Sequence, residues 1–387
     1  MRILVAPNAF KGALSAPEAA ACIARGLERS GLDCAVELMP IADGGDDTME
    51  VLAGQGGTIY PVMVDDPLGR PVQAAWGMLA DGETAVVEMA RASGLKLLRP
   101  EERDPLRAST YGTGQLIAAA IAGGARRIIV GVGGSATVDG GAGCMQALGV
   151  RLLDADGREV PRGGGLLSRV ARIDTSNMLA PLRERRVQVM VACDVDNPTL
   201  GPNGAAAVFG PQKGATPEQV ALLEAGLSHF FTLVAEQVGV DVRALRGGGA
   251  AGALSAGLAA FLGAELRRGI DLVLEALHFE ERLAGIDLVI TGEGRMDSQT
   301  LGGKGPFGVA VAARVHGVPS VALVGGVGDG EDALLDAGLT AIVPIAPGPI
   351  ALEEALAKAG ALLERAAIRL GRLIALGRAL PGRRSEL

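Results

Sequence analysis

The sequence predicts an α/β protein of two domains, in which a discontinuous, Rossmann-like parallel α/β domain carries a large inserted domain of mixed α/β structure. Three observations predict this fold class: a length of 387 residues, alternating strand and helix patterns at both ends of the chain, and a hairpin-rich stretch near residue 60. A chain of this length has more residues than one hydrophobic core ordinarily organises, so two domains are expected.

The N-terminal residues read as one β-α-β unit. The apolar run at 2–7 predicts a buried strand, 16–31 predicts an amphipathic helix, and 34–43 predicts a second strand. Short β-rich runs at 58–90, separated by D-P-L-G and A-D-G turns, then predict antiparallel hairpins. This change of pattern places a domain boundary near residue 60.

The α/β alternation returns from about residue 110 and becomes regular in the last hundred residues. Strands are predicted at 126–132, 150–154, 187–195, 286–293, 319–326 and 340–346, and helices at 113–122, 217–238, 307–316, 331–337 and 351–379, with an Ala/Gly-rich helix after 246–254. The C-terminal units resemble the N-terminal unit more than the middle of the chain. We therefore expect 1–60 and 284–387 to form the Rossmann-like domain, 61–283 to form the inserted domain, and the active-site cleft to lie between them.

The composition indicates which kinds of partner and which cellular compartment to expect. With 36 Lys+Arg against 44 Asp+Glu, the net charge of −8 argues against nucleic acid as the main partner. The four cysteines show no C-x-x-C spacing, which disfavours a zinc site or a disulfide framework and fits a reducing compartment. No secretory leader pattern or convincing membrane span is present in the sequence, so we expect a cytoplasmic protein without membrane contact.

Five polar, glycine-bearing loops follow predicted strands. They lie at 8–15, 42–48, 131–143, 193–205 and 291–306. Ligands of open α/β sheets bind outside the carboxyl ends of the strands, so five such loops together predict a polar cleft. Lys11, in the first of these loops, either holds an anion there or is an ordinary solvated turn residue.

The loop at 131–143, GVGGSATVDGGAG, is the best phosphate-loop candidate. Successive glycines let backbone amides converge on an anion, and two hydroxyl side chains lie in the loop. The candidate residues are Gly133, Gly134, Ser135, Ala136 and Thr137. The alternative is a tight turn with close helix packing.

The same loop also fits the outline of a dinucleotide fingerprint. Gly131, Gly133 and Ala136 match G-x-G-x-x-A after a strand, and Asp154 ends the next predicted strand about twenty residues on. Against this reading, glycines occupy the first turns of the helix that would follow, where helix formers are expected.

Carboxylates dominate the other loops. Asp43 lies in an acidic turn that could hold a cation, and Asp194 directly follows an apolar run, where it could accept a proton from an alcohol or bind a metal. The alternatives without a function are a solvated turn at Asp43 and, at Asp194, a carboxylate that accepts hydrogen bonds from backbone amides. None of the three histidines falls in these loops, so any general base is expected to be a carboxylate.

The loop at 291–306 mixes both signs of charge. Arg295, Asp297 and Lys304 would suit a charged ligand together with a metal, and the alternative is a plain salt-bridged loop.

Taken together, these motifs resemble one enzyme family. PNAFKGALSA, IADGGDDT, YGTGQLI, GVGGSATVDGGAG, ACDVDNP, VFGPQKGA, GAAGAL and DLVITGEGRMDSQTLGGKGP occur in the order seen in the bacterial glycerate kinase family of the glycerate 2-kinase type. The resemblance runs from residue 1 to about 330. It implies ATP-dependent phosphorylation of D-glycerate with Mg²⁺ in a two-domain α/β protein, with 2-phosphoglycerate favoured over 3-phosphoglycerate as product.

The resemblance also suggests roles for the candidate residues. Lys11 would neutralise the glycerate carboxylate or the transferring phosphate, and Asp194 would act as base or metal ligand with Asp43 as its partner. The metal ligands are then expected to be Asp43, Asp194 and Asp297, the phosphate or carboxylate contacts Arg295 and Lys304, and the phosphate cradle the backbone of 133–137.

Two motifs depart from the family pattern. The family usually has Asp-Ser before Phe-Lys-Gly, where this chain has Asn8 and Ala9. The family usually reads Gly-Gly-Glu-Gly-Thr, where Asp46 and Asp47 replace Glu-Gly here. The first departure removes a carboxylate at the end of the N-terminal strand, and the second shortens one carboxylate and adds another.

Three other functions compete with glycerate phosphorylation. A kinase for another small hydroxy acid is the nearest, because the sequence does not fix the acid. A dinucleotide-binding oxidoreductase would bind NAD(H) and need no Mg²⁺, and a binding or structural protein would not need five charged loops at strand ends. The oligomeric state, a homodimer included, stays open.

Overall fold

The computed structural model describes residues 1–45, 47–297 and 305–380. The chain divides into two compact units: unit 1, Met1–Asp43 with Val273–Leu387, and unit 2, Gly44–Leu272. The chain therefore passes from unit 1 to unit 2 at residues 43–44 and returns at 272–273; we call these points the first and second crossings. The sequence predicted them at 60–61 and 283–284. The first crossing comes earlier because the helix α2 (Thr48–Ala53) belongs to unit 2, where the Met49 amide donates to the Glu88 carboxylate over 2.9 Å.

Unit 1 is built on a parallel sheet of five strands in the order β13-β12-β11-β1-β2. The strands are β1 (Arg2–Val5), β2 (Ala35–Leu38), β11 (Leu288–Met296), β12 (Ser320–Val327) and β13 (Ala341–Pro344). From the central pair, β1 leads to β2 on one side, and β11 leads through β12 to β13 on the other. The edge between β1 and β11 is thus a topological switch point, where ligands of such sheets bind.

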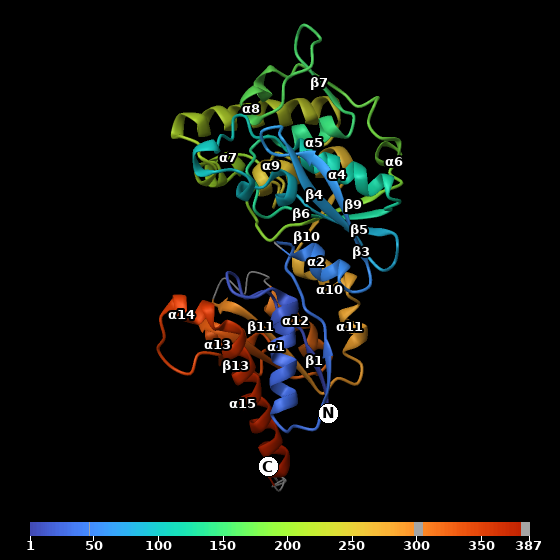
Figure 1. Cartoon of the computed structure of the whole chain (residues 1–387). Helices are drawn as coiled ribbons and strands as arrows, with labels where there is room; N and C mark the ends of the chain where they lie inside the picture. Colours follow the sequence, from blue (N-terminus) through green and yellow to red (C-terminus); the bar gives the residue numbers. More distant parts are fainter. Residues whose placement is uncertain (46, 298–304, 381–387) are drawn as a thin grey trace. The chain divides into compact units, whose positions relative to one another are not determined.

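Helices cover both faces of this sheet. They are α1 (Ala16–Arg29), α11 (Phe279–Arg282), α12 (Gly305–Val315), α13 (Glu331–Asp336), α14 (Leu352–Ala357) and α15 (Ala359–Ala379). Figure 1 shows α1 and α15 side by side, and both pack into the core that holds Val321 and Leu323. The alternate residues of that strand, Ala322 and Val324, face a second core with α12 and α13, as the period of a strand requires.

The start of α1 explains why the turn that carries Lys11 ends where it does. Ser15 caps the helix by accepting from the Glu18 amide, while the Glu18 carboxylate accepts from the Ser15 amide over 2.8 Å. The helix then buries its small face on α15, where a Cβ added at Gly26 would lie 2.5 Å from the Cβ of Ala367. The predicted helix at 16–31 is confirmed.

The C-terminal helix predicted at 351–379 is two helices. The chain breaks at Lys358, whose backbone angles (φ −109°, ψ 11°) end α14 and precede α15. Gly360 lies in the first turn of α15 and has a low helix propensity. The residues at the break therefore do not favour one continuous helix.

Unit 2 is built on a six-stranded mixed sheet in the order β10-β9-β6-β5-β4-β3. Its strands, with those of a small second sheet (β7 and β8), are β3 (Thr58–Asp65), β4 (Pro71–Met78), β5 (Thr84–Glu88), β6 (Arg127–Gly131), β7 (Arg151–Leu153), β8 (Arg172–Asp174), β9 (Gln188–Ala192) and β10 (Glu265–Arg267). The hairpins β3-β4 and β4-β5 are antiparallel, as predicted, and β5, β6, β9 and β10 are parallel.

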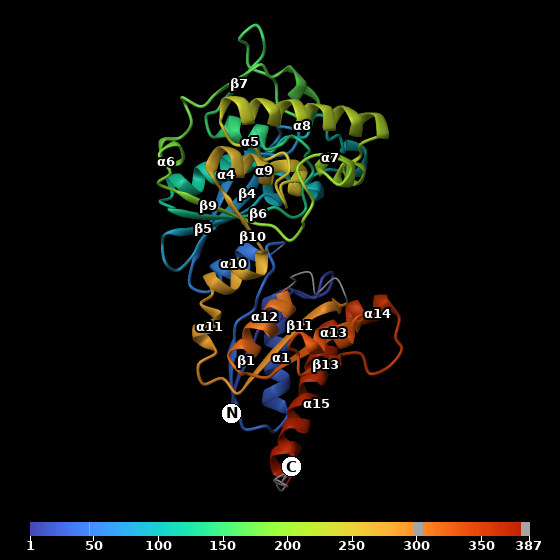
Figure 2. The ribbon, with the colours of Figure 1, turned by 180° about the vertical axis from the view of Figure 1, so that it is seen from behind.

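The helices of unit 2 apart from α2 pack into one large core with this sheet, and α2 contacts β4 and β5. Besides α2 they are α3 (Ala90–Ser93), α4 (Tyr111–Ala122), α5 (Ala142–Ala147), α6 (Ala180–Arg183), α7 (Ala205–Phe209), α8 (Pro217–Gln237) and α9 (Ala250–Leu262), with 3-10 turns at η1 (Leu95–Leu97), η2 (Pro100–Glu102), η3 (Gly164–Arg169) and η4 (Pro211–Lys213). In Figure 2, α5 and α9 lie between the sheet and the long α8, and α10 (Gly269–Ala276) leads out of the unit.

This topology contradicts the dinucleotide reading of 131–154. In a dinucleotide fold, the strand after the glycine loop and helix lies parallel in the same sheet as the strand before it. Here β7 pairs antiparallel with β8 in a separate two-stranded sheet, and the parallel neighbours of β6 are β5 and β9. Asp154 is therefore not positioned as the ribose-binding acid of such a fold.

The start of α9 has an unusual backbone. Ala251, Gly252 and Ala253 all adopt left-handed angles, with φ of 54°, 66° and 67°. Two of the three carry a Cβ, so this turn is strained and persists only because its surroundings fix it. A Cβ at Gly252 would lie 1.9 Å from the carbonyl oxygen of Thr137, so this turn packs directly against the glycine-rich loop.

None of the helices in the described part of the chain combines the length and the apolar character that a membrane crossing requires.

Candidate active site

The carboxyl edge of the sheet in unit 1 brings together the residues after β1 and β2. The Asn8 side-chain amide donates to the Asp43 carboxylate over 3.1 Å, while its own oxygen accepts from the Ala9 amide over 2.8 Å. Asn8 is buried, and its backbone amide donates to Gly292 in β11 over 2.8 Å. An ionised aspartate at position 8 could not donate a hydrogen bond to the Asp43 carboxylate and would repel it. The Asn8 amide can donate, so the two side chains pair directly.

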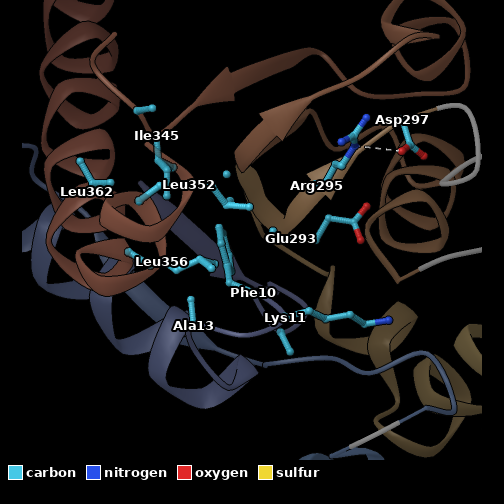
Figure 3. A pocket seen from close by; sticks show the side chains of 16 residues that line it. Phe10, Lys11, Ala13, Glu293, Arg295, Asp297, Ile345, Leu352, Leu356 and Leu362 are labelled. Atoms are coloured by element: carbon cyan, nitrogen blue, oxygen red, sulfur yellow. Dashed lines mark ion pairs between the residues drawn. The ribbon is translucent and has the colours of Figure 1, made fainter. Parts of the chain in front are cut away.

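A cavity of about 370 Å³ lies along this edge. It is lined by the segment after β1 (Ala9, Phe10, Lys11, Ala13), the end of β11 (Glu293, Gly294, Arg295, Asp297), Gly325 of β12, Ile345 and Ala346 after β13, and Leu352, Ala355, Leu356, Ala359 and Leu362 of α14 and α15. Figure 3 shows two walls, one charged and one apolar, with Phe10 between them. The cavity therefore suits a ligand with a charged part and an apolar part.

Its charged wall contains three residues that the sequence singled out. Lys11, Arg295 and Asp297 all line it, and the Arg295 guanidinium pairs with the Asp297 carboxylate over 3.3 Å. Glu293 is buried beside them. Lys11 is exposed, and no hydrogen bond or ion pair ties its ammonium group to any residue within the described ranges.

In unit 2, the predicted phosphate loop follows β6 and is exposed at its first half only. Gly133 and Gly134 are exposed, and Gly134 has a left-handed φ of 71°. Ser135, Ala136 and Thr137 are buried, and the Ala136 amide donates to the Ser93 carbonyl over 2.9 Å. An anion could thus meet the two glycines and the margin of Ser135, while Thr137 lies beneath the surface.

A buried lysine supports this loop from below. Lys213, in η4, is 1% exposed, and its Nζ donates to the Ser135 hydroxyl over 2.7 Å and to the Thr137 carbonyl over 2.6 Å. Its motif, VFGPQKGA, is one of those that carry the family resemblance, but the lysine is not among the residues predicted for the site. A lysine is by default a surface residue, and only the small and apolar residues around this one hint at its burial.

Burial shifts the pKa of two groups in this network in opposite directions. Loss of solvent lowers the pKa of Lys213 to about 7, against the attraction of the Asp139 carboxylate. The same effect raises the pKa of Asp139, although this carboxylate accepts hydrogen bonds from the Thr110 amide over 2.8 Å and the Thr110 hydroxyl over 2.9 Å. The lysine that holds the loop therefore titrates within reach of neutral pH.

Asp194 follows the next parallel strand of unit 2, β9, which ends at Ala192. The residue is exposed just beyond β9, and one of its carboxylate oxygens accepts from the Gly269 amide over 2.9 Å. This backbone contact orients the side chain beyond the strand end. The neighbouring Asp196 is held by the two-pronged guanidinium of Arg246, with both distances 2.7 Å, so the two aspartates have different surroundings.

A buried carboxylate at the end of β5 positions the segment that follows the first crossing. Glu88 accepts from the Met49 amide and, over 2.5 Å, from the guanidinium of Arg91, which also pairs with Glu50. Burial raises the pKa of Glu88 despite the nearby Arg91 charge. This network fixes α2 beside the strand ends of unit 2, and sequence reasoning did not identify it.

The structure thus places the predicted site residues in two groups. Lys11, Asp43, Arg295 and Asp297 lie at the carboxyl edge of unit 1, and Asp194 with the loop 133–137 lies at the carboxyl edge of the sheet in unit 2. Lys304 and Asp46 lie outside the described residues. Within the described ranges, no group of three or more His, Cys, Asp or Glu side chains is arranged to hold a metal ion.

Comparisons with known proteins agree along almost the whole chain. A sequence profile described as the glycerate kinase family matches residues 3–375. The glycerate kinase of Bacillus subtilis (strain 168) is 48% identical over 381 residues, 98% of this chain and 99% of that protein. The glycerate 2-kinase of Escherichia coli (strain K12) is 43% identical over 378 residues, 97% of this chain and 99% of that protein. A crystal structure of a Salmonella typhimurium LT2 protein, assigned as glycerate kinase 2, superimposes with a TM-score of 0.89 at 44% identity, covering 98% of this chain and 100% of that chain.

Proposed function

Because the chain belongs to the glycerate kinase family, we propose that it transfers the γ-phosphoryl group of ATP to a hydroxyl group of D-glycerate. The observation that carries this proposal is the 48% identity to a glycerate kinase over 98% of the chain, which includes every polar loop described above. The E. coli relative is a glycerate 2-kinase, which supports 2-phosphoglycerate as the product.

Phosphoryl transfer depends chiefly on positioning and on stabilising negative charge. Lys11 suits the second task, since its exposed ammonium group lies in the cavity wall and has no partner within the described ranges. We assign it to the transferring phosphate or to the glycerate carboxylate. Arg295, on the same wall, presents a planar guanidinium that can bind either anion with two hydrogen bonds.

Asp194 is our candidate for the group that accepts the proton of the attacking hydroxyl. Its hydrogen bond from the Gly269 amide orients the carboxylate at an exposed strand end, which is where an incoming substrate can reach it. Asp43, held by Asn8, is the corresponding carboxylate of unit 1. The exposed amides of Gly133 and Gly134 are assigned to an anionic group of substrate or nucleotide.

The donors at these strand ends fit a magnesium ion. Mg²⁺ prefers oxygen ligands and is usually held by one or two protein carboxylates together with waters and substrate phosphates. Asp43 and Asp297 in unit 1 and Asp194 in unit 2 are each a candidate ligand, and a site with one or two of them does not require a group of three acidic side chains, which the described residues do not form. When bound, the ion would neutralise charge on the phosphates.

The proposal is tested by a coupled ADP-release assay with ATP, MgCl₂ and D-glycerate. We expect turnover with D-glycerate, and ³¹P NMR of the product should show the coupling pattern of 2-phosphoglycerate. L-glycerate, glycolate and lactate serve as comparison substrates under the same conditions. Turnover with one of these acids but not with D-glycerate would contradict the substrate assignment.

The same assay checks the assigned residues. Asp194→Asn keeps the shape of the side chain but removes the base, so kcat is expected to fall by roughly 100-fold or more. Lys11→Met should lower kcat/KM by a similar factor, because a preorganised positive charge is lost. Lys358→Met is the matched control, since Lys358 is exposed and pairs with Glu354 outside the cavity lining.

A further inference from the structure

We propose that the cavity of unit 1 holds the adenosine part of the nucleotide against its apolar wall and directs the phosphates to its charged wall. This inference rests on the proposed function, because it places the ATP of that reaction. It also decides between the two glycine-bearing edges of the chain, assigning the nucleotide to unit 1 and leaving the loop at 133–137 to a smaller anionic group.

The apolar wall has no purpose in a glycerate site. It consists of Ile345, Leu352, Leu356 and Leu362, with alanines between them, and Phe10 lies beside it. Glycerate has three carbons, each bearing an oxygen, and gains nothing from such a surface. A purine base and the carbon face of a ribose are flat and weakly polar, so burying them against this wall is favourable.

The exposure of this wall supports the same conclusion. Leu352 is 74% exposed and Leu356 is 39% exposed, although both line the cavity. Large apolar side chains left open beside a concave surface are typical of a ligand site. The break at Lys358 produces this arrangement, because it separates α14 from α15 and lets both helices contribute leucines to one cavity.

The charged wall matches the other end of a metal-bound nucleotide. Lys11 and Arg295 supply positive charge for phosphate oxygens, and Glu293 and Asp297 supply carboxylates. Figure 3 shows these four side chains across the cavity from Leu352 and Leu362, with Phe10 between. A nucleotide with its Mg²⁺ carries both signs of charge, so one wall with both signs can receive it.

The position in the fold agrees with this assignment. The cavity begins at the switch point between β1 and β11 and extends over the ends of β12 and β13. Nucleotides bound to open α/β sheets lie at such points. Its volume of about 370 Å³ falls within the roughly 300 to 1,000 Å³ of small-molecule sites.

The test is direct binding of ADP in the presence of MgCl₂, measured by isothermal titration calorimetry on the full chain. Leu356→Gln places a polar but uncharged side chain on the apolar wall, so it weakens base contacts without repelling phosphates. We expect its Kd for ADP to rise at least tenfold, the KM for ATP to rise with it, and the KM for D-glycerate to stay within twofold. Leu376→Gln on α15 is the control, because Leu376 is exposed and does not line the cavity.

The outcomes separate this inference from the function on which it rests. If Leu356→Gln binds ADP as the wild type does while both turn over ATP and D-glycerate, the inference is overturned and the function stands. If the wild type neither binds ADP nor uses ATP, the proposed function itself fails. Leu356→Met guards against a folding defect, because a residue of similar volume should restore ADP binding to within about threefold of the wild type.

Discussion

At the scale of single residues, the most informative side chain is Lys213. Lys213 is 1% exposed, and among the described residues its ammonium group bonds to a hydroxyl and a carbonyl; burying its charge is costly, because neither partner carries a full negative charge. The Asp139 carboxylate attracts it electrostatically and is itself buried. Its hydrogen bonds position the loop at 133–137 from below.

The pKa of Lys213 gives a pH prediction. Its folded pKa of about 7 lies below the ordinary value of 10.5, so between these pH values the unfolded chain holds a proton that the folded chain lacks. The free energy of unfolding of the wild type should therefore rise with pH over this window, relative to Lys213→Met, by on the order of a few kcal/mol. Urea denaturation of both proteins at pH 6.5, 8 and 9.5 measures this difference.

Lys358→Met is the control variant, because it removes an exposed lysine by the same substitution that removes the buried Lys213. Its unfolding curves should track the wild type at every pH. A constant gap between the wild type and Lys213→Met from pH 6.5 to 9.5 would contradict the assigned titration.

At the scale of elements, the left-handed turn at the start of α9 fixes the glycine-rich loop from the other side. Gly252→Ala combines a left-handed φ of 66° with a contact of 1.9 Å to a backbone oxygen, which no rotamer change relieves. We expect the free energy of unfolding to fall by roughly 3 kcal/mol or more. We also expect kcat/KM to fall by about tenfold or more, because the loop must move. Urea denaturation and the ADP-release assay measure the two effects.

Gly157 allows the two contributions to be separated. It has a left-handed φ of 78° but no atom within 4 Å of an added Cβ. Gly157→Ala should therefore cost only the backbone term, about 1 to 2 kcal/mol, with kcat/KM unchanged. Equal losses in the two variants would show that the contact with Thr137 has no role.

The elements also show what could be read from the sequence. The strands of unit 1 and the hairpins of unit 2 were predictable, because an apolar run bounded by turn residues is a local signal for a strand. The break at Lys358 and the turn at 251–253 were not, since both depend on packing from distant segments. The same holds for the site: Lys11, Asp43 and Asp194 stand at predictable strand ends, whereas Lys213 and the apolar wall of α14 gain their roles only from tertiary contacts.

At the scale of the whole molecule, each unit has its own hydrophobic core. Leu363 in unit 1 and Leu227 in unit 2 are both 0% exposed, so they form a matched pair. Leu→Ala at such sites costs about 2 to 5 kcal/mol. We expect Leu363→Ala to speed amide hydrogen exchange within unit 1 and Leu227→Ala within unit 2, as followed by mass spectrometry of peptides. Equal acceleration in both units from either variant would mean that they unfold as one.

The pairing of β1 with β11 has a consequence for synthesis of the chain on the ribosome. Ile3 lies opposite Leu288, so the first strand to be made waits for a neighbour that is translated roughly 15 to 60 s later at ordinary elongation rates. Unit 2 is contiguous and can complete its core during that interval. The nascent N-terminal segment, with a strand destined for the centre of its sheet, must meanwhile be kept from aggregating. A ribosome that stalls before residue 288 would therefore carry a folded inserted unit and a sheet of which only β1 and β2 have been made.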